Sequence, residues 1–273
     1  MTPILCFDLE TIPDAAGLRR LESFDSSLAD AEGVAAVQAA RMESHGNDFL
    51  PQYLQRVWVV GCAFRDEEGF RVRCLGDSHG ASDEEESARI RSFFKIIEKH
   101  TPQLVSWNGS GFDLPVLHHR AMIHGVPAPR YWEQGDDDRD FKYNNYLSRY
   151  HHRHCDLMDI VSGYQNRAFA PLDGLARLCG FAGKLGEDGS KVWQSFLEGR
   201  GESVRAYCET DVVNTYLLFS RFRLIRGEWS EKFYQDELQL VRESLEKMVG
   251  DAASPLKGEH WKRYLAAAPA LHR

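Results

Sequence analysis

The chain carries four short runs in which apolar residues dominate. Runs of this length, rich in valine, leucine and phenylalanine, are typical of β-strands. We expect a buried first strand, two strands joined by a turn at 66–69, and a fourth short strand. Their ranges are 3–8, 56–65, 70–76 and 103–107.

Helical periodicity replaces the strand pattern in other segments. In 82–100, Ser82 and Glu85 have the spacing of a capping box, and an apolar stripe follows at Ile90, Phe93, Phe94 and Ile97. Further helices are predicted at 112–125 and 230–250, and helices dominate from Asp156 to about Leu224. Breaks are expected in that stretch near Gly163, Gly180 and Gly199.

This order of elements predicts an α/β fold with a mixed sheet flanked by helices. The polar residues 14–55, with helical character near 30–42, form a long excursion between strands, and we interpret them as an insertion or flexible arm. Residues 126–150 are predicted to be a loop. The Ala- and Pro-containing residues after 250 are expected to be loosely held.

The composition of the chain argues against some classes of function. The 273 residues carry a net charge of −8, which argues against a general polyanion binder, so contact with nucleic acid would be local or bridged by metal ions. Six cysteines without a CxxC pair indicate buried or semi-buried thiols of a reducing compartment. Without a signal-peptide pattern or an apolar run of about 20 residues, we expect a cytoplasmic protein that does not enter membranes.

The first strand ends with two acids, Asp8 and Glu10, whose side chains point to the same face because strand residues alternate. Two interpretations fit this pair equally well: a strand end that lies in solvent, and half of a divalent-metal site. Alone, Asp113 fits a helix cap, and Tyr207 with Asp211 fits an ordinary helix face. Asp156 and Asp159 fit an N-cap and a surface acid better than metal ligands.

Together these residues resemble the DEDD superfamily of 3′–5′ exonucleases, in its tyrosine-bearing branch. The shared pattern is D-x-E, then N-x3-F-D, then Y-x3-D, carried here by Asp8/Glu10, Asn108/Phe112/Asp113 and Tyr207/Asp211. The likeness is strongest to the proofreading exonuclease domain of family B DNA polymerases and to free-standing proteins similar to it. It implies an RNase H-like domain over 1–225, with 14–55 inserted, and a C-terminal helical extension over 226–273.

The resemblance also implies roles for these residues. Asp8 would bridge two Mg²⁺ or Mn²⁺ ions, Glu10 and Asp211 would complete the nucleophile-side ion, and Asp113 would hold the leaving-side ion. Tyr207 would orient the attacking water. Thr11, Asn108 and Phe112 are candidate substrate contacts, while Lys184, Lys191 and Arg205 could hold phosphate or be solvated surface charges.

The expected function is a metal-dependent 3′–5′ exonuclease acting on single-stranded nucleic acid 3′ ends, with DNA favoured over RNA and DNA repair as the setting. The alternatives are an exoribonuclease of the RNase D or oligoribonuclease type, a catalytically silent nucleic-acid-binding module on the same fold, and a small-nucleotide phosphodiesterase.

Overall fold

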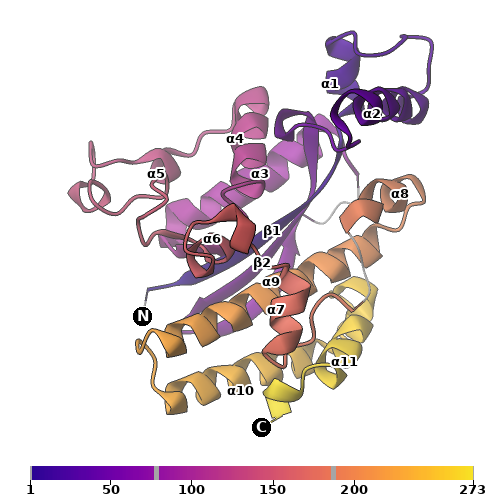
Figure 1. Cartoon of the computed structure of the whole chain (residues 1–273). Coiled ribbons are helices and arrows are strands. Elements are labelled where there is room, and N and C mark those ends of the chain that lie inside the picture. The colour runs from indigo at the N-terminus through magenta and orange to yellow at the C-terminus, as the bar shows by residue number, and fades with distance from the viewer. Residues whose placement is uncertain (1, 77–79, 186–188, 273) are drawn as a thin grey trace.

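A five-stranded mixed sheet forms the centre of the computed structural model, which describes residues 2–76, 80–185 and 189–272 (Figure 1). The strand order is β3-β2-β1-β4-β5, with β2 and β3 in an antiparallel meander on β1, and β4 and β5 parallel to it. This is the α/β, RNase H-like arrangement predicted from the sequence. The strands are β1 (Ile4–Pro13), β2 (Gln55–Asp66), β3 (Gly69–Leu75), β4 (Gln103–Ser106) and β5 (His154–Asp156). The three-residue β5 was not predicted.

Helices cover both faces of the sheet. On one face, α3 (Asp83–His100) and α4 (Asp113–His124) pack on the odd-numbered side chains of β1 from Leu5 to Leu9. On the other, α9 (Gly201–Ile225) packs on the even-numbered residues Ile4 and Cys6. Because strand side chains alternate, Asp8 and Glu10 continue the row that faces α9.

The predicted helix signals are confirmed where they were strongest. The Ser82 hydroxyl accepts a hydrogen bond from the Glu85 amide, the Glu85 carboxylate accepts one from the Ser82 amide, and the apolar stripe of α3 is buried. The predicted breaks fall at left-handed glycines just after α6 (Leu157–Val161), α7 (Leu172–Leu178) and α8 (Val192–Leu197). Within the predicted loop, α5 (Pro129–Trp132) forms one turn. Short 3₁₀ turns occupy Gln52–Leu54, Arg139–Phe141, Asn166–Ala168, Gly189–Lys191, Pro255–Gly258 and Pro269–His272.

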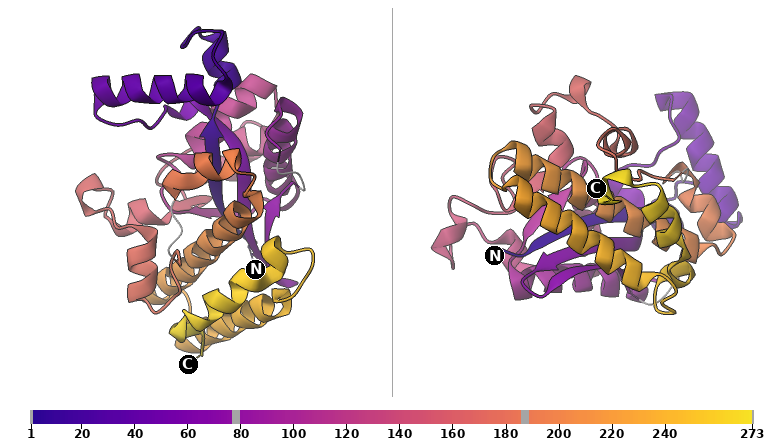
Figure 2. Two further views of the ribbon diagram at one scale, coloured as in Figure 1. Left: turned by 90° about the vertical axis from the view of Figure 1, so that its right-hand side faces the viewer. Right: turned by 90° about the horizontal axis from the view of Figure 1, so that it is seen from below.

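The C-terminal residues are held firmly, so the expectation of a loose tail is wrong. After α10 (Glu231–Met248), which lies along α9, the chain forms α11 (Glu259–Ala266), which packs on α10 (Figure 2). Trp261 and Tyr264 are buried in the same core as α9, and the Tyr264 hydroxyl donates to Asn214 Oδ1 at 2.7 Å. Two large aromatic rings three residues apart on one helix face outweigh the Ala and Pro content that suggested disorder.

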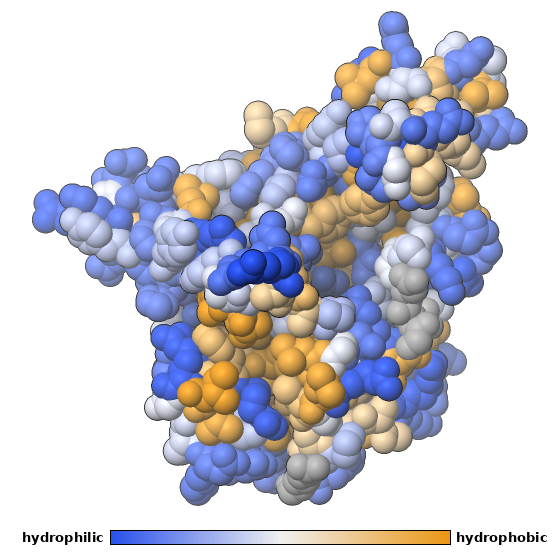
Figure 3. All heavy atoms as spheres, in the orientation of Figure 1, coloured by the Kyte–Doolittle hydropathy of each residue, from blue (hydrophilic) through white to orange (hydrophobic). Residues whose placement is uncertain are grey.

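Residues 14–55 form an arm that projects from one end of the sheet and contains α1 (Ala15–Arg20) and α2 (Asp30–His45) (Figure 1). The arm has a small core of its own, made by Leu18, Val34, Leu50 and Leu54. Its base is fixed by the buried Asp14, which forms ion pairs with Arg56 at 3.2 Å and Arg120 at 2.5 Å. The surface is hollowed beneath the arm, and hydrophobic residues border the hollow (Figure 3).

Five cysteines are buried and Cys179 is half-buried, as the sequence predicted. Among the residues that the structure describes, none of the helices has both the length and the apolar character needed to cross a membrane.

Candidate active site

Acidic side chains from three elements meet beside the second half of β1. Asp8 and Glu10 come from β1, Asp113 begins α4, and Asp211 lies one turn beyond Tyr207 on α9. A cavity of about 200 Å³ opens there, lined by Asp8, Leu9, Glu10, Thr11, Phe112, Lys184, Gly189, Tyr207 and Asp211. Residues more than 200 positions apart in the chain therefore share one small space.

The position of Asp113 follows from where two strands stop pairing. Strand β4 pairs with β1 only from Ile4 to Cys6, so the later amides of β1 on that side are not used by the sheet. The Leu9 amide donates instead to Asp113 Oδ1, at 2.9 Å in a buried setting. The first residue of α4 is thereby tied to the peptide between Asp8 and Glu10.

Crowding and burial disfavour the charged forms of these acids. Burial raises the pKa of Asp8 well above its ordinary range, and repulsion by Asp113 and Asp211 adds to the effect. Burial and repulsion by Asp8 and Asp211 also raise the pKa of Glu10. Burial raises the pKa of Asp113 to about 7, although the hydrogen bond from the Leu9 amide opposes the change. A cation among these groups would remove the repulsion.

One oxygen in the cluster has no partner among the described residues. Asp211 is 2% exposed, and its Oδ1 atom is buried and accepts no hydrogen bond from the part of the chain that the structure describes. An unsatisfied buried carboxylate oxygen is costly, and a bound cation or an ordered water would satisfy it.

Lys184 contributes a positive charge, and the sequence left open whether it holds phosphate or is a solvated surface residue. It is half-buried, its Nζ lies 2.7 Å from Asp211 Oδ2, and it donates to the Tyr207 hydroxyl. Burial lowers the pKa of Lys184, but the acids outweigh burial and raise it to about 12, so it stays charged. Lys191 and Arg205 do not line this cavity, and Arg205 donates to the Gly76 carbonyl oxygen.

The three predicted substrate contacts lie in two places. Thr11 and Phe112 line the cavity with the acids, and the Thr11 hydroxyl donates to Gln55 Oε1 at 3.0 Å. Asn108 lines a neighbouring cavity of about 440 Å³ instead. It has a left-handed backbone with φ of 68°, held by a hydrogen bond from its amide to Asp156 Oδ1.

Asp156 and Asp159 serve the structure. Asp156 caps α6, as predicted, and accepts the amide of Ser110 as well as that of Asn108. Asp159 was predicted to be a surface acid, and this is wrong. Its carboxylate is buried against Arg149, which forms two hydrogen bonds to it.

Phe49 was not predicted from the sequence to lie in this region. Phe49 lies on the return of the arm, 54% exposed, with its ring centroid 5.6 Å from that of Phe112. The Arg41 guanidinium donates to the Phe49 carbonyl oxygen, and Gln52 donates to the Gly111 carbonyl oxygen. No spacing within 14–55 signals this contact, because it depends on how the arm folds back.

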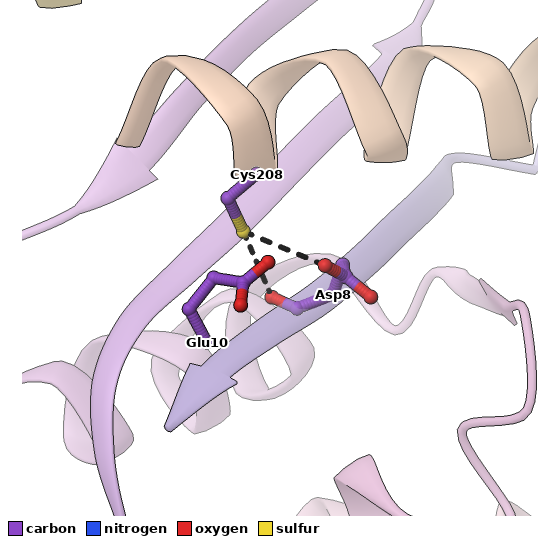
Figure 4. Close-up of side chains that lie close together, drawn as sticks. All are labelled: Asp8, Glu10 and Cys208. Atoms are coloured by element: carbon purple, nitrogen blue, oxygen red, sulfur yellow. Dashed lines mark hydrogen bonds between the residues drawn. The ribbon is translucent and has the colours of Figure 1, made fainter. Parts of the chain in front are cut away.

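Cys208 lies against the β1 acids from the α9 side (Figure 4). Its Sγ is 3.6 Å from the Asp8 carbonyl oxygen and 3.7 Å from Asp8 Oδ2. Burial raises the pKa of the Cys208 thiol, so the thiol is neutral beside the acids.

Comparisons with known proteins agree with this architecture. The model of a family described as a predicted 3′–5′ exonuclease related to the exonuclease domain of PolB matches residues 47–268. A DNA polymerase of Archaeoglobus fulgidus is 26% identical over 132 residues, which cover 47% of this chain and 16% of the polymerase.

Among solved structures, the family B DNA polymerase of Pyrobaculum calidifontis superposes with a TM-score of 0.51 at 18% identity. The match covers 98% of this chain and 29% of the polymerase chain. The chain therefore spans less than a third of either polymerase, and the structural likeness supports the fold alone.

Proposed function

The chain belongs to the family of predicted 3′–5′ exonucleases related to the PolB exonuclease domain, and from this premise we propose that it removes nucleotides from single-stranded 3′ ends by metal-dependent hydrolysis. The observation that carries the proposal is the convergence of Asp8, Glu10, Asp113 and Asp211 beside one small cavity. A DNA substrate is favoured over RNA because the similar proteins are DNA polymerases.

The donor set fits two hard divalent cations. Four carboxylates supply oxygen ligands of the kind that Mg²⁺ and Mn²⁺ prefer, and Asp211 Oδ1 is a buried oxygen without a partner among the described residues. Asp8, Glu10 and Asp211 would hold one ion, and Asp8 with Asp113 the other. Two bound cations of this kind would activate a water molecule as the nucleophile near neutral pH and would neutralise the charge on the leaving oxygen.

Two further side chains would position the reactants. Burial and the neighbouring acids raise the pKa of Tyr207, so its phenol stays protonated and can orient water by a hydrogen bond without acting as a base. Lys184 reaches both Tyr207 and Asp211, and once cations neutralise the acids its ammonium group can turn to a substrate phosphate.

The strand would reach the acids past Phe112. An aromatic ring at the edge of the cavity can stack on an unpaired base, and the neighbouring Phe49 extends the aromatic surface. With a net charge of −8, long-range attraction to duplex DNA is weak, so single strands with free bases are the favoured substrates. The role in DNA repair and the cytoplasmic location remain predictions.

A time course with 5′-labelled DNA and RNA of one sequence, with Mg²⁺ or Mn²⁺, tests the proposal. Stepwise shortening of the free DNA strand supports it, and a strand with a 3′-phosphate or annealed to its complement should be cut slowly. Faster shortening of RNA would assign an exoribonuclease. Internal fragments appearing first, or equal cutting of blunt duplex, would overturn the 3′–5′ assignment.

A further inference from the structure

The turn that carries Lys184 is fixed by a buried asparagine of α9. Asn214 is 0% exposed, and its side chain forms two hydrogen bonds with the residue before Lys184. The Gly183 amide donates to Asn214 Oδ1 at 3.3 Å, and Asn214 Nδ2 donates to the Gly183 carbonyl oxygen at 2.9 Å. A side-chain amide offers both an acceptor and a donor, whereas a carboxylate or an apolar side chain of similar size would break at least one of these bonds.

Asn214 lies on the same face of α9 as two residues of the candidate active site. Tyr207, Asp211 and Asn214 follow one another at spacings of four and three residues, which places them along one stripe of the helix. Lys184 Nζ lies 2.7 Å from Asp211 Oδ2 and donates to the Tyr207 hydroxyl. Asn214 therefore fixes the turn relative to the two groups that Lys184 reaches.

A second contact fixes the turn from the side of α7. Asp173 Oδ1 accepts a hydrogen bond from the Lys184 amide at 2.8 Å. Gly183 has a left-handed backbone with φ of 69°, and a Cβ added there would lie 2.4 Å from the same carboxylate oxygen. The backbone of the turn is thus bound to α7 and to α9, and the lysine side chain extends from it to the acids.

The C-terminal extension reaches this turn through α11. The Tyr264 hydroxyl donates to Asn214 Oδ1 at 2.7 Å, and Tyr264 is also 0% exposed, so bulk water does not compete for the bond. The Tyr264 hydroxyl and the Gly183 amide share one acceptor oxygen, and together they fix the orientation of the Asn214 side chain. Farther along the extension, the Ala270 amide donates to the Gly180 carbonyl oxygen at 2.9 Å.

Building on the proposed function, we propose that Asn214 is a positioning residue for Lys184, and that Tyr264 makes the C-terminal extension part of the catalytic unit by orienting Asn214. Both side chains act through Lys184. When the turn is free to shift, the lysine ammonium leaves its place beside Tyr207 and Asp211 and no longer meets the scissile phosphate. A displacement of about 1 Å can cost roughly a hundredfold in rate.

Turnover of a 5′-labelled DNA strand with Mg²⁺ tests the proposal in a double-mutant cycle. Tyr264→Phe, which removes one hydroxyl, should lower kcat by about threefold to tenfold, and Asn214→Ala, which frees the turn, by at least about tenfold. In the Lys184→Gln background, each change should cost less than about twofold, because the group that it positions is gone.

Equal factors in both backgrounds would overturn the proposal, because a residue that only supports the fold lowers activity whether or not Lys184 is present. That result would leave the proposed hydrolysis standing.

Tyr216→Phe is the matched control. Tyr216 is equally buried, and its hydroxyl also joins α9 to the extension, where it donates to Glu237 Oε2 on α10 at 2.6 Å. This variant should keep kcat within about twofold. A loss as large as that of Tyr264→Phe would show that the extension supports α9 in general, and would overturn the specific role of Tyr264.

Thermal unfolding in EDTA measures the positioning without turnover. Lys184→Gln should lower the Tm of the wild type, and this loss should be smaller in the Tyr264→Phe background and at least about halved in Asn214→Ala, where Lys184 has no fixed place beside Asp211. An equal loss in all backgrounds would refute the proposal. A reduced loss in a chain that hydrolyses no nucleic acid would support the positioning and overturn the proposed function.

Discussion

Lys184 places its ammonium nitrogen 2.7 Å from Asp211 Oδ2 and also donates to the Tyr207 hydroxyl, so its charge lies among the acids that would bind metal. In the metal-free protein, this charge offsets part of the repulsion among Asp8, Glu10 and Asp211. Bound cations would perform the same task.

Lys184→Gln should therefore destabilise the metal-free protein more than the metal-bound one. Loss of one partner of a partly buried ion pair costs about 1–3 kcal/mol, which corresponds to roughly 3–8 °C in Tm for a chain of this size. Thermal unfolding in EDTA and in Mg²⁺ measures the two effects. Lys191→Gln, which removes an exposed lysine outside the cavity, is the control and should change Tm by less than about 1 °C. Equal losses with and without metal would mean that Lys184 does not substitute for a cation.

Asp113 should make the stability of the metal-free protein depend on pH. Its pKa is about 7 in the fold against an ordinary value of 3.8, so the folded state binds more protons between these pH values. Protonated Asp113 therefore contributes fully to the free energy of unfolding below about pH 4. This contribution, up to roughly 4 kcal/mol, is lost as the pH rises to about 7 and above. Asp113→Asn keeps an oxygen for the Leu9 amide but cannot ionise. In EDTA, the Tm of Asp113→Asn minus that of the wild type should become larger between pH 4 and pH 8. A difference that does not change with pH would show that Asp113 does not take up a proton on folding.

Asp8→Ala and Asp211→Ala should abolish hydrolysis and leave the fold intact. Each removes a proposed metal ligand, so turnover should fall below about 1% of wild type. Because Asp8→Ala also removes a charge from a repelling cluster, its Tm in EDTA should hold or rise, whereas Asp211→Ala also breaks the ion pair with Lys184 and should lower Tm slightly. Asp137→Ala, at an exposed acid in a loop, is the control and should keep both turnover and Tm. Near-normal turnover in either site variant would remove that residue from the metal site.

Contacts between residues that are close in the sequence could be predicted, and contacts between distant residues could not. Asp8 and Glu10 share a face because strand residues alternate, and that local rule was enough to pair them. The bond from the Leu9 amide to Asp113 was not predictable, because it exists only where β4 stops pairing with β1 after Cys6. The sequence pointed to Asp113 through the resemblance, not through geometry.

Residues outside regular patterns were harder to place. Lys184 follows α7 and reaches Asp211 through a turn, and no periodicity in the sequence marks that contact. The tail was misjudged because Ala and Pro were given more weight than Trp261 and Tyr264, which α11 turns to one face. Long, periodic helices such as α3 and α10 were predicted closely, since their patterns are local.

Tyr207→Phe should slow hydrolysis without weakening metal binding. Its hydroxyl is proposed to orient water, and loss of one positioning hydrogen bond reduces rates by about tenfold to a thousandfold. Turnover and the Mg²⁺ concentration for half-maximal rate separate the two effects. An unchanged rate across pH would exclude Tyr207 from the mechanism. A large shift in the Mg²⁺ requirement would indicate that it supports the ligands instead.

Phe49→Ala should weaken the use of long single strands more than that of very short substrates. The ring is more than half exposed, beside Phe112 at the edge of the cavity, and its backbone is fixed by the hydrogen bond from Arg41, so it can offer a rigid face to a base upstream of the terminal nucleotide. Stacking on one aromatic ring is worth about 1–3 kcal/mol per base, so KM for a 20-residue oligonucleotide should rise by about fivefold to a hundredfold with kcat little changed. A dinucleotide has only one base upstream of its terminal nucleotide, so the loss on this substrate should be smaller. Phe233→Ala, which removes an exposed ring on α10, is the matched control and should leave both substrates unaffected. Equal losses on the long and the short substrate would show that Phe49 supports Phe112 and the fold of the arm without contacting the strand.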